Sequence, residues 1–428
     1  MSSSHALLAE LQNGKFDTWF AKLYGTSAVQ KQRIRYENAI RRFVELYGHC
    51  EGVSLFSAPG RTEIGGNHTD HNHGRVLAAS VNLDIIAVAA STNDASITVK
   101  SEGYLQDVIN LAELAVQPTE RNRSSSLIRG MVDGFVKNGY RIGGFKAYTT
   151  SNVLKGSGLS SSAAFEVLVG TILNHIYNGG TVDAVSIAKI AQYAENEHFG
   201  KPSGLMDQMA SSVGGIIAID FEDTTAPVIR TVDFDFAAVK HRLCIVDVGG
   251  NHANLTHEYA AITAEMKEIA NALGVLHLRQ TDHAALLPAI PKLREQYGDR
   301  AVLRALHFFS DNERVEKQVK ALQAGNFEEF KQLVIESGHS SFEYLQNIHP
   351  ADMVKRQEMS LALALAQKVL NGKGAWRVHG GGFGGTTQNF VPEDLVEDFT
   401  NTVETVFGKS NCHVLSIRPC GSVCLTAE

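Results

Sequence analysis

The sequence predicts an α+β fold with antiparallel sheets. Segments with strand-like and helix-like apolar spacing are interspersed, but they do not alternate with the regular period of βαβ units. From Thr256 onward the pattern becomes mainly helical, which indicates a domain boundary near residues 220–240. At 428 residues the chain is long enough for two domains, each with a sizeable core.

The part before this boundary begins with helical spacing and continues with short strands. Residues 27–47 are expected to form an amphipathic helix, because Ile34, Ile40 and Phe43 share one face and Gly48 suits its C-terminal cap. Apolar runs predict strands at 53–58, 76–83, 85–91, 96–101, 145–150 and 216–220. Helical spacing predicts helices at 124–138, 163–177 and 183–198, with a short one at 203–212.

The part after the boundary is expected to hold longer helices and a few strands. An apolar run predicts a strand at 243–248. The helices that follow are expected at 258–273, 300–325, 327–337 and 353–370. A strand-loop segment at 376–391, a helix at 392–407 and a strand at 413–418 complete the predicted set.

Composition and charge exclude several classes of protein. Asp and Glu number 46 against 39 Lys and Arg, so the net charge of −7 argues against nucleic acid or an anionic membrane as a partner. The five cysteines lack C-x-x-C spacing, which indicates neither a disulfide framework nor a zinc finger. The first residues do not resemble a secretory signal, and no apolar run would span a bilayer. We therefore expect a cytoplasmic protein.

The clearest chemical signal is a loop of small residues before the predicted helix at 163–177. Residues 154–166 read LKGSGLSSSAAFE, and no G-x-x-x-x-G-K-[ST] pattern occurs in the chain. Unpaired N–H groups at a helix N-terminus attract anions, and serine hydroxyls there can bind phosphate or Mg²⁺. The loop is thus predicted to bind phosphate without being a P-loop. The alternative is an ordinary capped helix after a flexible turn.

A second cluster of polar residues spans 58–74, APGRTEIGGNHTDHNHG, where proline and glycine make a helix improbable. Arg, Asn, His and Asp in one loop are typical of a site for a hydroxyl-rich ligand. The alternatives are a turn whose Asp and Asn bond their own backbone and a metal site. The candidate metal ligands would be His68, Asp70, His71 and His73.

Two further segments carry weaker signals. Residues 195–200 and 204–208 contain Glu195 late in a helix and Asp207, which could act as a general base if a cation kept it ionised. Residues 380–385 match G-x-G-x-x-G, but no βαβ unit surrounds them, so we reject a dinucleotide-binding interpretation. A loop that closes off a ligand is expected there instead.

Four segments resemble the motifs of the GHMP small-molecule kinases, and within them the galactokinase family. They are Gly-Asn-His-Thr-Asp at 66–70, Gly-Leu-Ser-Ser-Ser-Ala-Ala at 158–164, Met-Asp-Gln at 206–208 and Gly-Gly-Gly-Phe-Gly-Gly at 380–385. The resemblance implies a two-lobed fold with an S5-domain-2-like N-terminal lobe and a ferredoxin-like C-terminal lobe. It implies an N-terminal extension at 1–26, lobes at 27–225 and 226–428, and an active site in the cleft between them.

The resemblance also implies roles for individual residues in transfer of the γ-phosphoryl of ATP to the anomeric hydroxyl of galactose. Asp207 matches the catalytic base and Arg61 its partner, while Ser162 and Glu195 match Mg²⁺ ligands. The positions that match the ATP phosphate loop are Gly156, Ser157, Gly158, Leu159, Ser160, Ser161 and Ser162. The positions that match sugar contacts are Asn67, His68, Asp70, Gly204 and Tyr259.

The chain departs from the galactokinase pattern at several of these places. Family members usually carry Glu at Asn67, Tyr at His71, Asn at Glu63, and two arginines at Ile262 and Thr263. These departures concern the sugar and leave the phosphoryl-transfer residues in place. Alternatives to galactose are an amino sugar, an arabinose-type pentose or a uronic acid, and a non-catalytic sugar sensor is a further alternative. The expected partners are the sugar and ATP, in a monomer or weak homodimer.

Overall fold

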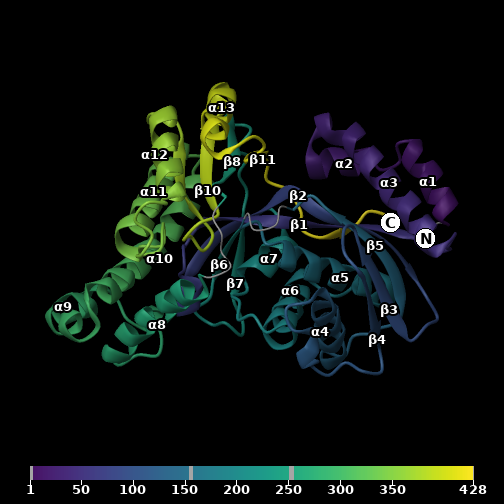
Figure 1. Ribbon diagram of the computed structural model, residues 1–428, viewed down its shortest axis with the longest axis horizontal. Coiled ribbons are helices and arrows are strands. Elements are labelled where there is room, and N and C mark those ends of the chain that lie inside the picture. The colour runs from purple at the N-terminus through teal and green to yellow at the C-terminus, as the bar shows by residue number, and fades with distance from the viewer. Residues whose placement is uncertain (1–2, 154–157, 250–254, 428) are drawn as a thin grey trace.

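The computed structural model describes residues 3–153, 158–249 and 255–427, and it confirms an α+β fold (Figure 1). The larger of the two sheets has the order β12-β1-β2-β5-β3-β4, with β6 on β2 and β7 on β6. Its strands are β1 Ser54–Gly65, β2 Arg75–Ser91, β3 Ser96–Ser101, β4 Gln106–Asn110, β5 Phe145–Ser151, β6 Ile216–Asp220, β7 Val228–Val232 and β12 Val423–Cys424. Its pairs are antiparallel except β3 with β5, which is parallel.

The larger sheet is covered on both faces because consecutive residues of its central strands are apolar and point to opposite faces. Phe56 and Ala87 face the helices α4 Ser124–Lys137, α5 Ser161–Asn178 and α6 Ala184–Tyr193. Leu55 and Val88 face α1 Ser4–Gln12, α2 Asp17–Tyr24 and α3 Val29–Tyr47. The short helix α7 Met206–Val213 lies beside β1 and β2.

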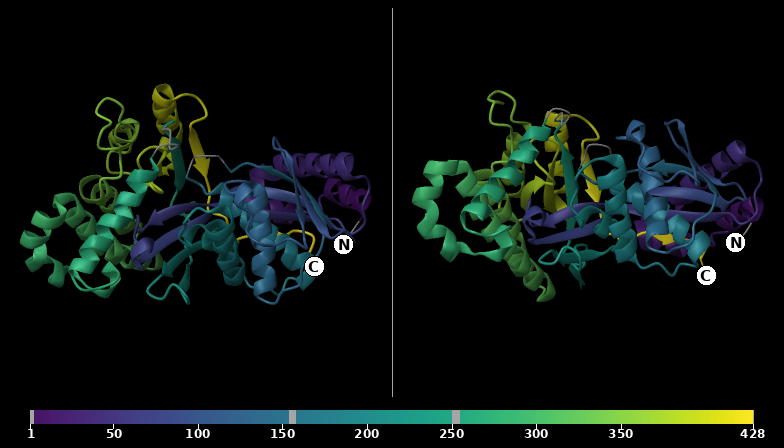
Figure 2. Two further views of the ribbon diagram at one scale, coloured as in Figure 1. Left: turned by 60° about the horizontal axis from the view of Figure 1, so that its bottom comes forward. Right: turned by 90° about the horizontal axis from the view of Figure 1, so that it is seen from below.

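The second sheet has the antiparallel order β11-β8-β10-β9, formed by Cys412–Leu415, His241–Asp247, Thr386–Pro392 and Ala375–His379. The helices of this half are α8 Thr256–Ala272, α9 His283–Tyr297, α10 Asp299–Gln323, α11 Phe327–Ser340, α12 Glu358–Leu370 and α13 Val396–Phe407. Both views in Figure 2 place α8–α10 at one end of the molecule and α1–α3 at the other. The C-terminal segment returns to the first sheet, where Cys424 of β12 pairs with Phe56 of β1.

Several predicted boundaries are wrong, and strand pairing explains those in β1 and β2. Residues 58–65 form a strand and not a loop, because β1 continues past Pro59 through register shifts that accommodate the proline. The strands predicted at 76–83 and 85–91 are one strand, β2. The helix predicted from 353 begins at Glu358, and the strand predicted at 413–418 ends at Leu415. The sequence patterns missed α1, α2, α9, β4, β7 and β12.

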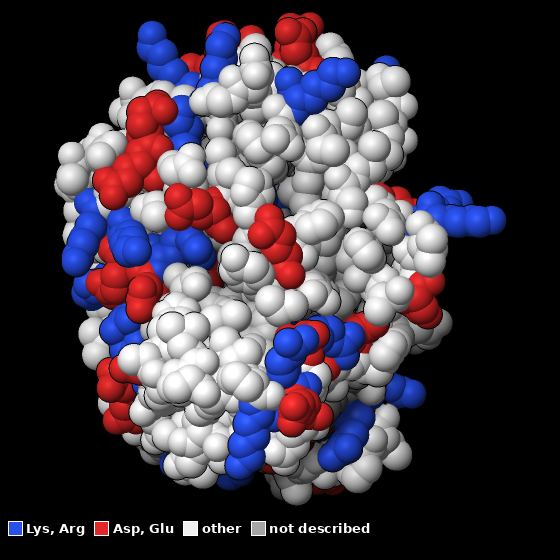
Figure 3. All heavy atoms as spheres, turned by 90° about the vertical axis from the view of Figure 1, so that its left-hand side faces the viewer, with Lys and Arg blue, Asp and Glu red and all other residues white. Residues whose placement is uncertain are grey.

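The surface at the α8–α10 end carries acidic and basic side chains in alternation, without a patch of one sign (Figure 3). Arg294 pairs there with Asp299, and Arg300 with Glu265. Within the described residues, no helix has both the length and the apolar character needed to cross a membrane.

A buried carboxylate, Asp84 at the middle of β2, ties the N-terminal helices to the sheet. Its side chain is fully buried and accepts hydrogen bonds from Arg35 of α3 at 2.6 Å, from Tyr24 of α2 at 2.5 Å and from Ser57 of β1. Arg418, also fully buried, approaches it to 3.3 Å from the C-terminal segment. Burial acts to raise the pKa of Asp84, but the two guanidinium groups outweigh it and the pKa is lowered.

Replacing Asp84 should therefore destabilise the fold. We expect Asp84→Asn to lower the free energy of unfolding by about 3–5 kcal/mol, because it leaves the buried Arg418 and the largely buried Arg35 without their charge partner. Asp299→Asn, at an ion pair whose side chains are more than half exposed, should cost less than about 1 kcal/mol. Denaturant titration measures both.

Because the pKa of Asp84 is lowered in the folded protein, its contribution to stability should persist above the pKa of about 4 in the unfolded chain and decline below it. Equal effects of the two variants would contradict this account.

Candidate active site

A cavity of about 890 Å³ opens between the β1–β2 connection, the start of α7, the start of α8 and the glycine loop after β9. Six of the seven residues that the resemblance assigned to catalysis or to the sugar line it: Arg61, His68, Asp70, Gly204, Asp207 and Tyr259. They come from segments that are as far as 198 positions apart, from 61 to 259. The structure thus brings together residues that only the family resemblance had grouped.

Arg61 is the centre of this arrangement. Its Nε donates to Oδ1 of Asp207 at 2.6 Å, and its Nη1 donates to the carbonyl oxygen of Gly158. The hydroxyl of Ser160 donates to the other oxygen of Asp207, Oδ2. One guanidinium therefore joins β1, the first turn of α7 and the serine-rich turn that precedes α5.

The surroundings of Asp207 keep it ionised. Burial acts to raise its pKa, but the charge and hydrogen bond of Arg61, together with the hydrogen bond from Ser160, lower the pKa below its ordinary value. The side chain is 27% exposed and lines the cavity, so the carboxylate remains accessible to a ligand. A carboxylate in this state can accept a proton or a hydrogen bond from a hydroxyl group.

The serine-rich turn is fixed against β1 by close backbone contacts. The backbone N–H of Arg61 donates to the carbonyl oxygen of Leu159 at 3.1 Å. A Cβ at Gly60 would lie 2.8 Å from that same oxygen, so the approach requires glycine. Ser160 takes a left-handed conformation with φ of 54° directly before α5 begins at Ser161. The first turn of α5 thus presents its free N–H groups beside Asp207. Gly156 and Ser157 lie outside the described residues.

Next to this helix end, oxygen ligands suited to a divalent cation lie together. The hydroxyl of Ser162 is 3.2 Å from Oε1 of Glu195, which is buried in the π-helical turn Ala194–Phe199. Lys201 Nζ pairs with the same oxygen at 2.9 Å, and Ser203 and Gln208 donate to Oε2 at 2.7 Å each. A hydroxyl and a carboxylate fit Mg²⁺, which takes one or two protein oxygens together with phosphate oxygens and water.

On the other side of Arg61, the side chains predicted to contact a sugar are held by short contacts. His68 Nε2 lies 2.9 Å from the carbonyl oxygen of Gly381, and burial lowers the pKa of His68 to about 4, so its ring is neutral. A Cβ at Gly204 would lie 2.2 Å from Oδ2 of Asp70. The hydroxyl of Tyr259 donates to the carbonyl oxygen of Gly382 at 2.9 Å. In the described part of the chain, no three His, Cys, Asp or Glu residues gather as a metal site would require.

Asn67 differs from the other predicted sugar contacts because it lies behind the cavity wall. It is fully buried, and its Nδ2 donates to Glu63 Oε1 at 2.9 Å and to the Gly380 carbonyl at 2.7 Å. Its Oδ1 accepts from Asn347 at 2.8 Å and from Ser341 at 3.2 Å. All four hydrogen-bonding positions of the amide are thus used within the protein.

The sequence analysis gave no binding or catalytic role to two residues that line the cavity. Glu63 lines the wall where Asn67 was expected, and Lys201 pairs with Glu195. Glu63 stands two residues after Arg61 on β1, so in a regular strand both side chains share one face. The loop interpretation of residues 58–74 concealed this pattern. Of the positions that depart from the family pattern, Glu63, His71 and Thr263 line the cavity, whereas Ile262 is buried in the core of the α8–α10 helices.

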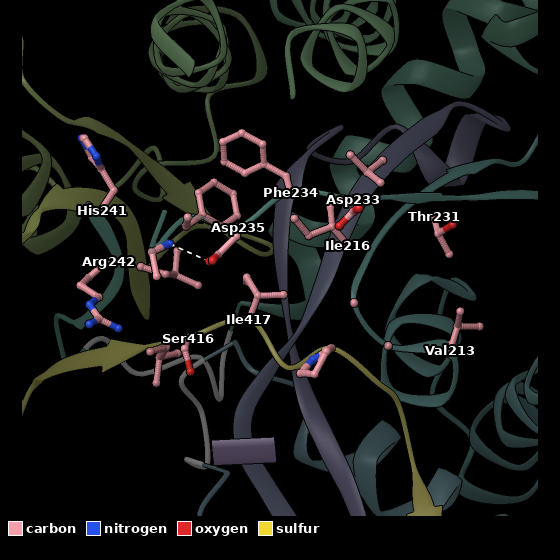
Figure 4. A pocket seen from close by; sticks show the side chains of 18 residues that line it. Val213, Ile216, Thr231, Asp233, Phe234, Asp235, His241, Arg242, Ser416 and Ile417 are labelled. Carbon is pink, nitrogen blue, oxygen red and sulfur yellow. Dashed lines mark hydrogen bonds between the residues drawn. The ribbon is translucent and has the colours of Figure 1, made fainter. Parts of the chain in front are cut away.

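A second cavity, of about 520 Å³, lies between β6, β7 and the second sheet (Figure 4). Phe234, Ile417 and the acidic residues Asp233 and Asp235 line it. None of the predicted site residues that the structure describes is part of its wall.

Comparisons with known proteins agree with the geometry. Residues 126–215 match the GHMP kinases N terminal domain, and residues 41–91 match the galactokinase galactose-binding signature. A galactokinase of Streptomyces coelicolor is 31% identical over 369 residues, which cover 86% of this chain and 91% of that protein. A galactokinase of Actinobacillus pleuropneumoniae is 30% identical over 380 residues, covering 87% and 93%.

The fold comparison points the same way. The crystal structure of Lactococcus lactis galactokinase complexed with galactose superimposes with a TM-score of 0.77 at 26% identity, covering 90% of this chain and 98% of that one. A mevalonate kinase of Methanococcus jannaschii shares the fold at a TM-score of 0.61 and 15% identity. With a relative above 30% identity along most of both sequences, the chain belongs to the galactokinase family of the GHMP kinases.

Proposed function

We propose that this chain is an ATP-dependent galactose 1-kinase that works in the cytoplasm as a monomer or weak homodimer. The observation that carries the proposal is the contact of Arg61 with both Asp207 and the turn before α5. It places a carboxylate held ionised beside a helix N-terminus, which is where a phosphate would bind. The galactokinase relatives and the galactose-binding signature at 41–91 support galactose as the acceptor.

In the proposed reaction, Asp207 accepts the proton of the anomeric hydroxyl as the sugar oxygen forms its bond to the γ-phosphorus. The bond from that phosphorus to the bridging oxygen breaks, and ADP leaves. Arg61 keeps Asp207 ionised and offsets negative charge that develops near the transferring group. The N–H groups at the start of α5, with Ser160 and Ser161, orient the phosphates.

The proposed metal is Mg²⁺, held by Ser162 and Glu195, and when bound it neutralises phosphate charge. Lys201 would share that neutralisation, because its ammonium already lies 2.9 Å from Glu195. His68, Asp70, Gly204 and Tyr259 would position the sugar through side-chain and backbone contacts.

A panel of free sugars tests the substrate directly. We expect ATP-dependent ADP release with galactose to exceed that with glucose, arabinose, galactosamine and galacturonic acid. Preference for another sugar would keep the kinase activity but replace the substrate. ADP release with none of them, although the protein binds galactose, would identify a non-catalytic sensor.

The base is tested by Asp207→Asn. Because the amide cannot accept the proton, kcat should fall by about 10²–10⁴-fold with little change in the KM for ATP. Asp223→Asn is the control, because Asp223 is exposed and lies outside the cavity. The pKa of its carboxyl is also lowered, by a hydrogen bond from Thr225. Steady-state kinetics measure both. Turnover of Asp207→Asn at the normal rate would remove Asp207 from the mechanism.

The metal site is tested by Glu195→Gln. The Mg²⁺ concentration for half-maximal rate at fixed ATP should rise at least about 10-fold, because even residues that only orient metal ligands have effects of this size. Glu397→Gln, at an exposed position of α13, should leave it unchanged. An unchanged Mg²⁺ requirement in Glu195→Gln would contradict the assignment.

The contact of Gly204 with Asp70 is tested by Gly204→Ala. The new Cβ would lie 2.2 Å from the Asp70 carboxylate and must displace it. We expect the KM for the sugar to rise about 10-fold or more, the effect of losing a hydrogen bond to a charged group, while the KM for ATP stays near its original value. A change confined to the KM for ATP would show that Asp70 does not serve the sugar.

A further inference from the structure

Glu63 is a buried carboxylate in the cavity wall that the mechanism above does not use. It lies on β1, is 4% exposed, and lines the same cavity as Arg61 and Asp207. A charged group is rarely buried to this extent unless it is paired or has a function. Its contacts therefore indicate what it can bind.

Only one oxygen of this carboxylate is used within the described protein. Oε1 accepts from Arg377 Nη2 at 2.8 Å and from Asn67 Nδ2 at 2.9 Å. No described residue donates a hydrogen bond to Oε2. The side chain thus offers a free acceptor at the wall of a cavity that is large enough for a sugar.

The two residues that hold Glu63 are themselves fixed. Arg377, fully buried on β9, donates its Nη1 to the carbonyl oxygen of Ile64 at 2.6 Å. Asn67 is anchored by Asn347 and by the Gly380 carbonyl. Because two donors hold Oε1, the direction of Oε2 is also fixed. A ligand group that binds Oε2 therefore meets an acceptor that is already oriented, as a specific contact requires.

We propose that Glu63 determines sugar specificity by accepting, at Oε2, a hydrogen bond from one non-anomeric hydroxyl of the sugar, with Asn67 and Arg377 as positioning residues. The inference rests on the proposed function, which assigns the anomeric hydroxyl to Asp207. In the galactokinase pattern the carboxylate that contacts the sugar is at position 67, which is Asn67 in this chain. The proposal assigns that contact to the carboxylate of Glu63 instead. Asn67 then acts on the sugar only through Glu63.

This assignment makes sugar binding depend on pH near neutrality. Burial raises the pKa of Glu63 to about 7, with Arg377 and Arg61 opposing the rise and Asp70 adding to it. The hydroxyl donates to the ionised form, so affinity should fall as the pH drops from 8 to 6. A neutral carboxyl group is a weaker acceptor than a carboxylate.

Of the titratable groups near Glu63, His68, Asp207 and Asp311 keep one protonation state over this range. His68 has a pKa of about 4 because it is buried, and its ring stays neutral over this range. Arg61 outweighs the effect of burial on Asp207 and lowers its pKa. His307 and Arg314 do the same for Asp311, so both carboxylates stay ionised. His379 Nε2 lies 3.1 Å from the hydroxyl of Thr62 and 3.4 Å from the backbone nitrogen of Glu63.

The test is calorimetric binding of galactose and its 2-, 3-, 4- and 6-deoxy derivatives to the full-length protein and to Glu63→Gln. We expect one derivative to bind wild type about 10- to 100-fold more weakly than galactose, the effect of losing a hydrogen bond to a charged group. Glu63→Gln should bind galactose correspondingly weakly and should no longer distinguish that derivative from galactose. This non-additivity would not arise from a purely structural role. Equal discrimination by wild type and variant would overturn the proposal.

The pH dependence supplies a second readout that does not require the variant to fold. In wild type, the Kd for galactose should rise as the pH falls from 8 to 6, while the Kd of the affected derivative should stay flat. Asp107→Asn is the matched control, because burial raises the pKa of that carboxyl too, on β4 and outside the cavity. Parallel pH profiles for galactose and all four derivatives would overturn the proposal. Discrimination at Glu63 without phosphorylation would instead contradict only the kinase assignment.

Discussion

The hydrogen bonds of one guanidinium group, that of Arg61, hold the site together. They join β1 to the first turn of α7 through Asp207 and to the turn before α5 through Gly158. Without this charge the burial of Asp207 would favour its neutral form. The same contact therefore fixes Asp207 beside the turn before α5 and, in the proposed mechanism, sets the protonation state of the base. The fold supplies the rigid strand from which Arg61 projects, since β1 is buried along its whole length.

Much of this site could be predicted from the sequence because its signals are local. The serine-rich loop, the Gly-Asn-His-Thr-Asp segment and Met-Asp-Gln each carry their chemistry within a few residues, and the structure brings Ser160, Arg61 and Asp207 into contact. The α+β class could be predicted from the spacing of apolar residues, because the buried face of each helix or strand must be apolar. What the local patterns could not supply was the assembly of these segments, which the family resemblance provided.

The sequence predictions fail where contacts between residues far apart in the chain determine the local structure. Proline and glycine made residues 58–65 look like a loop, but pairing with β2 keeps them in a strand and places Glu63 beside Arg61. The family resemblance put Asn67 in the sugar site, whereas hydrogen bonds from Asn347 and Ser341, some 280 positions away, hold it behind the cavity wall. Helix α9 was missed because it contains Pro288 and Pro291, and β12 because two residues carry no pattern.

The central claim is that the carboxylate of Asp207 faces the anomeric hydroxyl of galactose when the phosphoryl group is transferred. Phosphorus–proton correlation NMR of the product made from galactose and ATP tests it most directly. The account predicts a single phosphate ester coupled to the anomeric proton, formed in equal amount to ADP. A phosphate coupled to the protons at carbon 6, or ADP formed without any sugar phosphate, would contradict it.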